Sequence, residues 1–333
     1  MTKICVVGTT TWGTTLAVIN ASSDLEVTLL TRSTAETDLL QENRKNLRFL
    51  PDTPFPDNLQ VSNCANSAIT NSEIIIFAVP SHTLRDNIAK ISDNFKSNHI
   101  IVSATKGLEA HTSKRMSEVI KEEIHSVPED QVCAMSGPNL ANEIIRGNPS
   151  STVVASENLD CATFVQSTLN SSKFRIYTNT DIIGVEIGGA LKNITAIASG
   201  IADGLGLGDN AKAAIITRGL SEMSRLGLCL GASRLTFSGL AGMGDLIATC
   251  SSNLSRNRRL GMSLAKGISL EEILKKMDNV AEGISTTKAV IPMARELQIQ
   301  FPIGEAVYNI LFNGSNPSKV AELLMERKPK QEN

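Results

Sequence analysis

The chain has 333 residues and a mass of 35.7 kDa, of which 41% are hydrophobic and 20% charged. That length allows about two domains with sizeable cores, and the composition is that of a globular protein rather than a disordered or fibrous one. Thirty-two Lys and Arg residues against 34 Asp and Glu leave a net charge of −2. This balance gives no field that attracts nucleic acid or an anionic membrane, so we expect a small-molecule partner and no nucleic acid.

Six cysteines are scattered without a C-x-x-C pair, and several stand inside apolar runs, as Cys5 does. This usage is typical of reduced core thiols in a cytosolic protein. The N-terminus shows no basic segment with a cleavage site, and no stretch reaches about 18 uninterrupted apolar residues. We therefore expect a cytoplasmic protein with no membrane span and no metal site.

Short β-branched apolar runs alternate with helical patterns over the first half of the chain, at the spacing of βαβ units. The predicted strands are 4–7, 27–30, 74–79, 100–103, 132–135 and 152–155. The helical segments between and after them are 13–21, 34–45, 82–91, 113–123, 140–146 and 158–168. The near-continuous apolar character of 74–79 is what a strand buried on both faces requires. These features predict a Rossmann-like, doubly wound, mostly parallel sheet.

Strand signals stop at about residue 180, and long helical patterns rich in Ala, Gly, Leu and Ile follow. The predicted helices are 181–203, 210–226, 256–265, 270–276, 285–297, 303–312 and 317–327. The sequence thus predicts an α/β dinucleotide-binding domain at 1–179 and an all-helical substrate-binding and catalytic domain at 180–333.

The motif GTTTWG at 8–13 follows the first predicted strand and leads into a helix. It is similar to the G-x-G-x-x-G fingerprint, whose glycines permit a tight turn, close approach of a pyrophosphate and close packing of the helix. Thr10 stands where the second glycine is expected. We expect its side chain to hold the phosphates further out or to shift the loop. An ordinary strand–turn–helix without a ligand is the alternative.

Arg32 lies just beyond the second predicted strand, where NAD-specific folds usually place an acid for the ribose 2′-hydroxyl. No acid stands at that point of the sequence. Arg32 can instead pair with a 2′-phosphate, and the hydroxyls of Thr31 and Ser33 can assist. NADPH is therefore expected to be at least as acceptable as NADH, and a solvated residue at a helix start is the alternative reading of Arg32.

Lys106 and Lys192 are the candidate amines of the site. Lys106 follows the strand 100–103, at the sheet edge where open α/β folds bind ligands. The alternative is a surface lysine with no role in the site. Lys192 is the one charged residue of the run 187–202, on a stripe of small and polar residues. Burial there lowers the pKa of an amine toward the range of proton exchange at neutral pH. The alternative is that Lys192 reaches water or pairs with Glu186 or another acid.

Two further segments carry charge into the helical half. The glycine-rich segment 239–244 delivers Asp245 to the start of an apolar helix, and the run SRNRR occupies 255–259. Guanidinium forks with a hydroxyl, an amide and a helix start fit a phosphate group. A solvated basic face is the alternative, and the absence of interleaved aromatics argues against nucleic acid.

The order and spacing of eight motifs extend over nearly the whole chain. They are TWG at 11–13, FLPDTPFP at 49–56, FAVPSH at 77–82, ATKGLE at 104–109, SGPNLA at 136–141, EIGGALKNITAIASGIADGLGLGDNAKAA at 186–214, GLAGMGDLIATCSSNLSRNRRLG at 239–261 and VAEG at 280–283. In these motifs the chain resembles the bacterial NAD(P)-dependent glycerol-3-phosphate dehydrogenases. The family usually has Gly at position 10 and often Ser or Thr at position 139, so Thr10 and Asn139 are departures.

The resemblance implies roles for individual residues. The family's catalytic lysine falls on Lys192. Its substrate contacts fall on Lys106, Gly137, Asn139, Asp245, Ser255, Arg256 and Asn257. Its contacts with NADPH or NADH fall on Thr11, Trp12, Arg32, Lys106, Ala141, Arg256, Val280 and Glu282.

The resemblance also implies a reaction, the interconversion of dihydroxyacetone phosphate and sn-glycerol 3-phosphate, which supplies glycerol phosphate for phospholipid synthesis. A homodimer is the assembly considered. Two alternatives stay open at this point. One is a sibling with the same two-domain plan, such as a 3-hydroxyacyl-CoA or 6-phosphogluconate dehydrogenase. The other is a dinucleotide-binding sensor without catalysis, which Thr10 in the phosphate loop suggests.

Overall fold

The computed structural model describes residues 2–277, 281–329 and 331. Its main sheet has eight strands in the order β10-β9-β8-β7-β6-β1-β2-β5, and β3 and β4 form a separate antiparallel pair. The strands are β1 (Lys3–Val7), β2 (Glu26–Leu30), β3 (Lys45–Asn46), β4 (Leu50–Pro54), β5 (Leu59–Ser62), β6 (Ile74–Phe77), β7 (Ile100–Ser103), β8 (Val132–Ser136), β9 (Ser150–Ala155) and β10 (Phe174–Asn179). All neighbours in the main sheet are parallel except β8 and β9, which confirms the predicted mostly parallel architecture.

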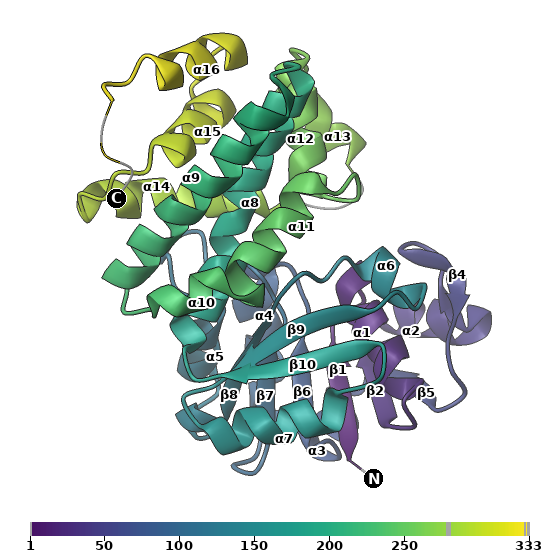
Figure 1. Ribbon diagram of the computed structural model, residues 1–333. Coiled ribbons are helices and arrows are strands. Elements are labelled where there is room, and N and C mark those ends of the chain that lie inside the picture. The colour runs from purple at the N-terminus through teal and green to yellow at the C-terminus, as the bar shows by residue number, and fades with distance from the viewer. Residues whose placement is uncertain (1, 278–280, 330, 332–333) are drawn as a thin grey trace.

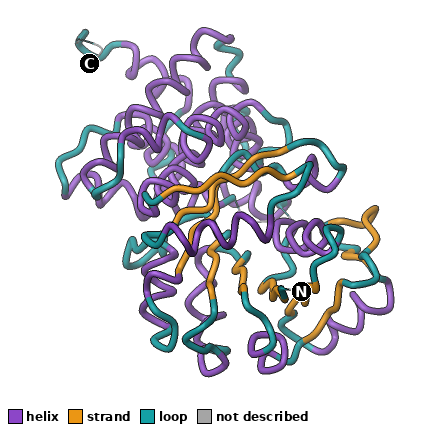
Figure 2. Tube along the Cα trace, turned by 60° about the horizontal axis from the view of Figure 1, so that its bottom comes forward, coloured by secondary structure: helices purple, strands orange, loops and turns teal. Residues whose placement is uncertain are grey.

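Helices cover both faces of this sheet (Figures 1 and 2). They are α1 (Thr11–Ala21), α2 (Thr34–Asn43), α3 (Ala65–Thr70), α4 (Leu84–Ala89), α5 (Met116–Glu123), α6 (Ala141–Ile145) and α7 (Leu159–Leu169), with 3₁₀ turns η1 (Ser81–Thr83), η2 (Ser92–Asn94) and η3 (Glu129–Gln131). Because successive strand residues point to opposite faces, Ile4 and Val6 pack toward α1 and α7, whereas Cys5 and Val7 pack toward α3, α4 and α5. Each apolar strand therefore fills two cores, as a doubly wound fold requires.

The sequence prediction omitted β5 and β10, which are the two edges of the main sheet. Their inward residues are buried while alternate residues face outward, so the run of β10 reads as Phe174, Arg175, Ile176 and Tyr177 rather than as a continuous apolar segment. An edge strand is covered on fewer sides than a central one, and its polar positions weaken the signal on which the prediction depended.

The second half of the chain is all helical, as predicted, and gathers at one end of the sheet (Figure 1). Its elements are α8 (Ile182–Gly204), α9 (Gly208–Cys229), α10 (Arg234–Ser238), the π-helical turn η4 (Leu240–Gly244), α11 (Asp245–Ser251), α12 (Arg256–Ala265), α13 (Leu270–Lys276), α14 (Glu282–Glu296), α15 (Pro302–Phe312) and α16 (Pro317–Met325). The short α10 and the π-helical form of the glycine-rich turn were not predicted.

Helix α8 is the centre of the helical half, and its side chains are buried from Val185 to Ala202. It packs against α9, α11, α12 and α14, which surround it. Among the described residues it is the one helix that is long and apolar enough to span a membrane. Of its most apolar stretch of 18 residues, 89% is buried inside the protein. That burial identifies α8 as the core helix of a globular domain.

All six cysteines are free thiols. Four of them, Cys5, Cys133, Cys161 and Cys250, are buried, which agrees with the predicted core positions. Cys64 and Cys229 are exposed, so the core interpretation was wrong for these two.

Candidate active site

Three ionisable side chains from distant parts of the chain meet in one buried cluster. The Lys192 amine donates hydrogen bonds to Asp245 Oδ1 and, at 2.9 Å, to Thr249 Oγ1. Lys106 Nζ lies 2.7 Å from the other carboxylate oxygen, Asp245 Oδ2, and 2.8 Å from the carbonyl oxygen of Gly137. Asp245 is 1% exposed and Lys192 is 7% exposed. One carboxylate thus bridges two amines, which we call the Lys106–Asp245–Lys192 cluster.

Glycines on α8 bring the parts of this cluster together. A Cβ at Gly188 would lie 2.5 Å from the carbonyl oxygen of Ala241, and one at Gly189 would lie 2.4 Å from Ser136 Oγ. Because both separations are far below a normal contact, only glycine lets η4 and the end of β8 approach α8 so closely. The approach places Asp245, the first residue of α11, directly over Lys192. The stripe of small residues that carries Lys192 thus admits η4 at Gly188.

The environment of Lys192 lowers the pKa of its amine from 10.5 to about 7. Desolvation by burial is the largest cause, the attraction of Asp245 opposes it, and the like charge of Lys106 adds to it. An amine with such a pKa exchanges a proton readily near neutral pH. Lys192 pairs with Asp245, whereas Glu186 is engaged by Arg115 and Ser117 at 2.8 Å.

The predicted phosphate residues stand at the start of α12. Ser255 is buried and caps the helix, accepting a hydrogen bond from Arg258 N at 3.2 Å. Arg256 is exposed and forms no hydrogen bond or salt bridge with any residue that the structure describes. Arg258 is tied to Asp203, with Nε 2.6 Å from Oδ2. The guanidinium of Arg256 is therefore the one of this pair that a ligand can engage.

Asn257 connects this helix start to the neighbourhood of Lys192. Its amide nitrogen donates to Asn193 Oδ1 at 2.8 Å, and its oxygen accepts from Gly283 N at 3.0 Å. Asn193 follows Lys192 on α8, so α8, α12 and α14 are fixed relative to one another at this point. One N–H of the Asn257 amide is left for a ligand.

The segment after β8 supplies the remaining sheet-edge residues. Gly137 contacts Lys106 as described, and a Cβ there would lie 2.9 Å from Thr152 Cα, so the segment lies close against β9. Asn139 is held to the same strand: its Oδ1 accepts from Thr152 Oγ1 at 3.0 Å. Ala141 is the first residue of α6. The side chain of Asn139 thus bonds to β9, and it forms no hydrogen bond with the cluster among the described residues.

The loop after β1 has the backbone of a dinucleotide loop. Gly8 adopts φ +118°, and a Cβ there would lie 2.8 Å from Ala78 O. A Cβ at Gly13 would lie 2.0 Å from Gly8 O, so the first and last glycines of the fingerprint are both required. Thr10 adopts φ −67° and ψ 170°, an ordinary extended conformation. Its hydroxyl accepts from Gly13 N at 3.1 Å and donates to Ala78 O at 2.8 Å.

Thr10 therefore fills the role of the helix cap rather than facing outward. The expectation that its side chain displaces the phosphates or shifts the loop assumed that the hydroxyl points outward. In the structure the hydroxyl points inward and forms hydrogen bonds within the protein. Thr11 opens α1, and the helix N-terminus offers the N–H groups that bind phosphate. Trp12 packs edge-on against Phe174, and its buried Nε1 has no partner among the described residues.

The remaining predicted cofactor contacts are Arg32, Glu282 and Val280. The Arg32 side chain is 74% exposed at the end of β2. Glu282, the first residue of α14, accepts from Ser81 Oγ at 2.6 Å and from Ser81 N at 3.2 Å, which joins the helical half to the loop after β6. Val280 lies outside the described residues.

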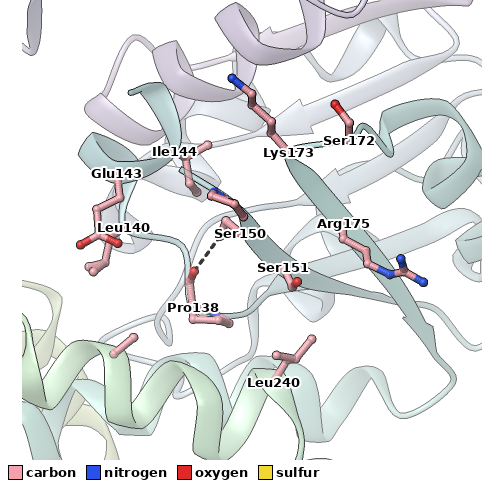
Figure 3. Close-up of a pocket in the computed structure, with 12 residues that line it drawn as sticks. Pro138, Leu140, Glu143, Ile144, Ser150, Ser151, Ser172, Lys173, Arg175 and Leu240 are labelled. Carbon is pink, nitrogen blue, oxygen red and sulfur yellow. Dashed lines mark hydrogen bonds between the residues drawn. The ribbon is translucent and has the colours of Figure 1, made fainter. Parts of the chain in front are cut away.

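A cavity of about 440 Å³ adjoins this region, between the β9 and β10 edge of the sheet and η4 (Figure 3). Figure 3 shows the hydrogen bond from Ser150 to the carbonyl oxygen of Pro138, with Lys173 above it and Arg175 to the right in this view. None of the predicted site residues lines it. The chemistry of the site is therefore concentrated in the buried cluster and not in this cavity.

Sequence reasoning missed three polar residues of the site. Thr249 holds the Lys192 amine, and Asn193 holds Asn257. Thr249 lies four residues after Asp245 on one helix face, a spacing from which its contact could have been inferred. The third is Glu36, in the first turn of α2, whose carboxylate accepts from Thr9 Oγ1 at 2.5 Å and from Arg32 N at 3.2 Å.

Comparison with known proteins places this geometry in a family. Residues 3–162 match the model for the N-terminus of NAD-dependent glycerol-3-phosphate dehydrogenase, and residues 181–322 match the model for its C-terminus. A glycerol-3-phosphate dehydrogenase [NAD(P)+] of Dehalococcoides mccartyi is 48% identical over 98% of this chain and 91% of its own length. One from Chlorobium phaeobacteroides is 46% identical over 99% of both chains. The crystal structure of glycerol-3-phosphate dehydrogenase from Coxiella burnetii has 36% identity and a TM-score of 0.93, over 98% of this chain and 99% of that one. The chain therefore belongs to the NAD-dependent glycerol-3-phosphate dehydrogenase family.

Proposed function

We propose that this chain catalyses the reversible reduction of dihydroxyacetone phosphate to sn-glycerol 3-phosphate with NADH or NADPH, at the Lys106–Asp245–Lys192 cluster. The observation that carries the proposal is a buried lysine with a pKa of about 7, paired with a carboxylate at the carboxyl edge of a dinucleotide fold. Family membership agrees with this activity.

The loop after β1 fits a dinucleotide. The close contacts of Gly8 and Gly13 and the backbone N–H groups at the start of α1 form a cradle for phosphate oxygens, and the buried indole N–H of Trp12 is a donor without a partner among the described residues. Thr11, Trp12, Arg32, Ala141, Val280 and Glu282 are the proposed holders of the cofactor, with Lys106 and Arg256 at its nicotinamide end. When bound, the nicotinamide supplies or accepts the hydride at C4.

Lys192 donates the proton to the substrate oxygen as negative charge develops there, and takes it back in the reverse direction. Lys106 adds positive charge to the same oxygen, which stabilises the developing alkoxide. Asp245 is the positioning residue, because it holds both amines through its two oxygens. Thr249 fixes the Lys192 amine from the other side.

Arg256 binds the phosphate of the substrate, with Ser255 and Asn257 at the same helix start. The guanidinium forms no hydrogen bond or salt bridge among the described residues, although the charge of Glu282 acts on it, so its N–H donors are available for a dianion. Gly137 and Asn139 border the substrate from the sheet. Binding at this non-reacting end positions the carbonyl group toward the amines.

The remaining sequence predictions belong to the same proposal. A boundary at 179/180 is supported by the end of β10 at Asn179 and the start of α8 at Ile182. A cytoplasmic location, a homodimer and a place in the supply of glycerol phosphate for phospholipids complete it. The free state of all six thiols supports a reducing compartment.

The test is an absorbance assay that follows NADH and then NADPH in the presence of dihydroxyacetone phosphate. With dihydroxyacetone phosphate we expect oxidation of the reduced cofactor. With 3-hydroxyacyl-CoA or 6-phosphogluconate and the oxidised cofactor, we expect no reduction of the cofactor. A sensor without catalysis would bind the dinucleotides and leave their absorbance constant, and that result would refute the proposal.

A further inference from the structure

Glu36 occupies the space between the loop after β1 and the loop after β2. These two strands are parallel neighbours, with Val7 opposite Leu30, so their carboxyl ends lie side by side. Glu36 reaches across both loops: one carboxylate oxygen accepts from Thr9 Oγ1 at 2.5 Å, and the other accepts from the backbone N–H of Arg32 at 3.2 Å. The side chain is nevertheless 26% exposed, so it also faces solvent.

In a dinucleotide fold, an acid at this position can contact the bound cofactor. The adenosine ribose lies at the end of the second strand, where a carboxylate accepts hydrogen bonds from its hydroxyls. Each carboxylate oxygen has two lone pairs, so the hydrogen bonds to Thr9 and Arg32 leave Glu36 free to accept from a ligand. Residues 31–33 contain no acid, and the fold supplies one from the first turn of α2 instead.

The groups that could bind a 2′-phosphate lie beside the Glu36 carboxylate or are already hydrogen-bonded. The Arg32 guanidinium has its Nε 4.0 Å from Glu36 Oε2, so its charge is partly balanced by the acid. The Thr31 hydroxyl is hydrogen-bonded to Thr37 at 2.6 Å. Arg44 donates to the carbonyl oxygens of Leu59 and Pro56 at 3.0 and 2.6 Å, and Leu59 pairs with Val27 near the other end of β2. A phosphate on the ribose would meet the carboxylate of Glu36, with the exposed Arg32 side chain as the cation that can offset its charge.

We propose that Glu36 binds the 2′-hydroxyl of the adenosine ribose and makes NADH the preferred dinucleotide over NADPH. The inference rests on the proposed function, because it concerns the cofactor of that same site. It differs from the expectation, drawn from Arg32 and the hydroxyls of Thr31 and Ser33, that NADPH is at least as acceptable as NADH. The charge of Glu36 supplies both effects: it strengthens a hydrogen bond from the hydroxyl and repels a phosphate.

The test measures dissociation constants directly, by calorimetry or protein fluorescence, for NADH and NADPH. In the wild-type protein we expect NADPH to bind at least about tenfold more weakly than NADH. Glu36→Gln should lower the ratio of the NADPH constant to the NADH constant by about tenfold or more, because a hydrogen bond to a charged group becomes neutral and the repulsion disappears. The fragments 5′-AMP and 2′,5′-ADP should show the same change, since they carry only the adenosine end.

Asp38→Asn is the matched control, because Asp38 is an exposed acid on the same helix with no contact to either loop among the described residues. It should leave the ratio unchanged. If Glu36 only braces the loops, Glu36→Gln will weaken both dinucleotides equally, and that constant ratio overturns the inference. A wild-type ratio of one or less also overturns it, and this measurement needs no variant. Absence of binding by either dinucleotide would overturn the proposed function itself, together with this inference.

Discussion

Replacing Lys192 by methionine removes the buried amine while keeping the length and apolar character of the side chain. If Lys192 is the proton donor, kcat for dihydroxyacetone phosphate reduction should fall by about 10²–10⁴, the contribution of general acid–base catalysis. That loss corresponds to about 2.7–5.5 kcal/mol of transition-state stabilisation, at about 1.36 kcal/mol for each factor of ten.

Stability should respond very differently to this substitution. Asp245 keeps Lys106 at 2.7 Å, and the Thr249 hydroxyl keeps its hydrogen bond to the carbonyl oxygen of Asp245 at 2.6 Å. No buried charge or donor is left without a partner, so we expect the free energy of unfolding to change by no more than about 1 kcal/mol. Asp245→Ala, by contrast, leaves two amines without their carboxylate and should lower the free energy of unfolding by about 3–5 kcal/mol.

The assay pairs steady-state kinetics with urea unfolding of the same preparations. Lys288→Met is the control, since Lys288 is an exposed lysine of α14 and its loss should change neither quantity. If Lys192→Met retained more than about a tenth of the wild-type kcat, the assignment of Lys192 as proton donor would be refuted. If it unfolded several kcal/mol more easily, the account of the shared carboxylate would be wrong.

Three further outcomes are expected. Because ketone reduction needs the protonated amine and the pKa of Lys192 is about 7, kcat/KM for dihydroxyacetone phosphate should fall about tenfold per pH unit above that value; a profile that stays flat to about pH 9 would contradict this. Arg256→Ala should raise KM for dihydroxyacetone phosphate by at least about tenfold and leave the melting temperature unchanged, because a charge-assisted hydrogen bond contributes about 1.5–3 kcal/mol to binding. Arg259→Ala, at a neighbouring position, is the control. An unchanged KM for Arg256→Ala would show that Arg256 does not bind the phosphate. Thr10→Gly should destabilise the protein by about 1 kcal/mol in urea unfolding through the lost bond to Ala78, and should leave the NADH dissociation constant within about threefold; a large gain in affinity would show that the threonine obstructs the phosphates.

The fold was predictable where burial is symmetrical. Strand β6 is apolar at every position because helices cover both its faces, and its run of isoleucines is legible in the sequence alone. Strands β5 and β10 are the sheet edges, and their alternation of buried and exposed residues does not differ from that of many loops and helices. The strands at the edges of a sheet are therefore the ones that local sequence patterns identify least well.

The site was predictable as a set of residues and not as a set of contacts. Lys192 drew attention because it is the one charge in a long apolar helix, and Asp245 because it follows a glycine-rich turn. Their contact joins residues 53 positions apart, and that of Lys106 with Asp245 joins residues 139 apart, so only the fold establishes them. Glu36 was not predicted, because NAD-specific folds usually carry the acid at the end of the second strand, whereas here it comes from the first turn of the following helix.

The shared carboxylate acts as an interlock between the two halves of the chain. Lys106 comes from the sheet, while Asp245 and Lys192 both belong to the helices. A rotation that separates the halves would take Lys106 away from the pair, and the pKa of Lys192 would rise, since the like charge that lowers it would be gone. The amine would then hold its proton more tightly. Its pKa therefore stays near 7 only while Lys106 lies beside Asp245 and Lys192.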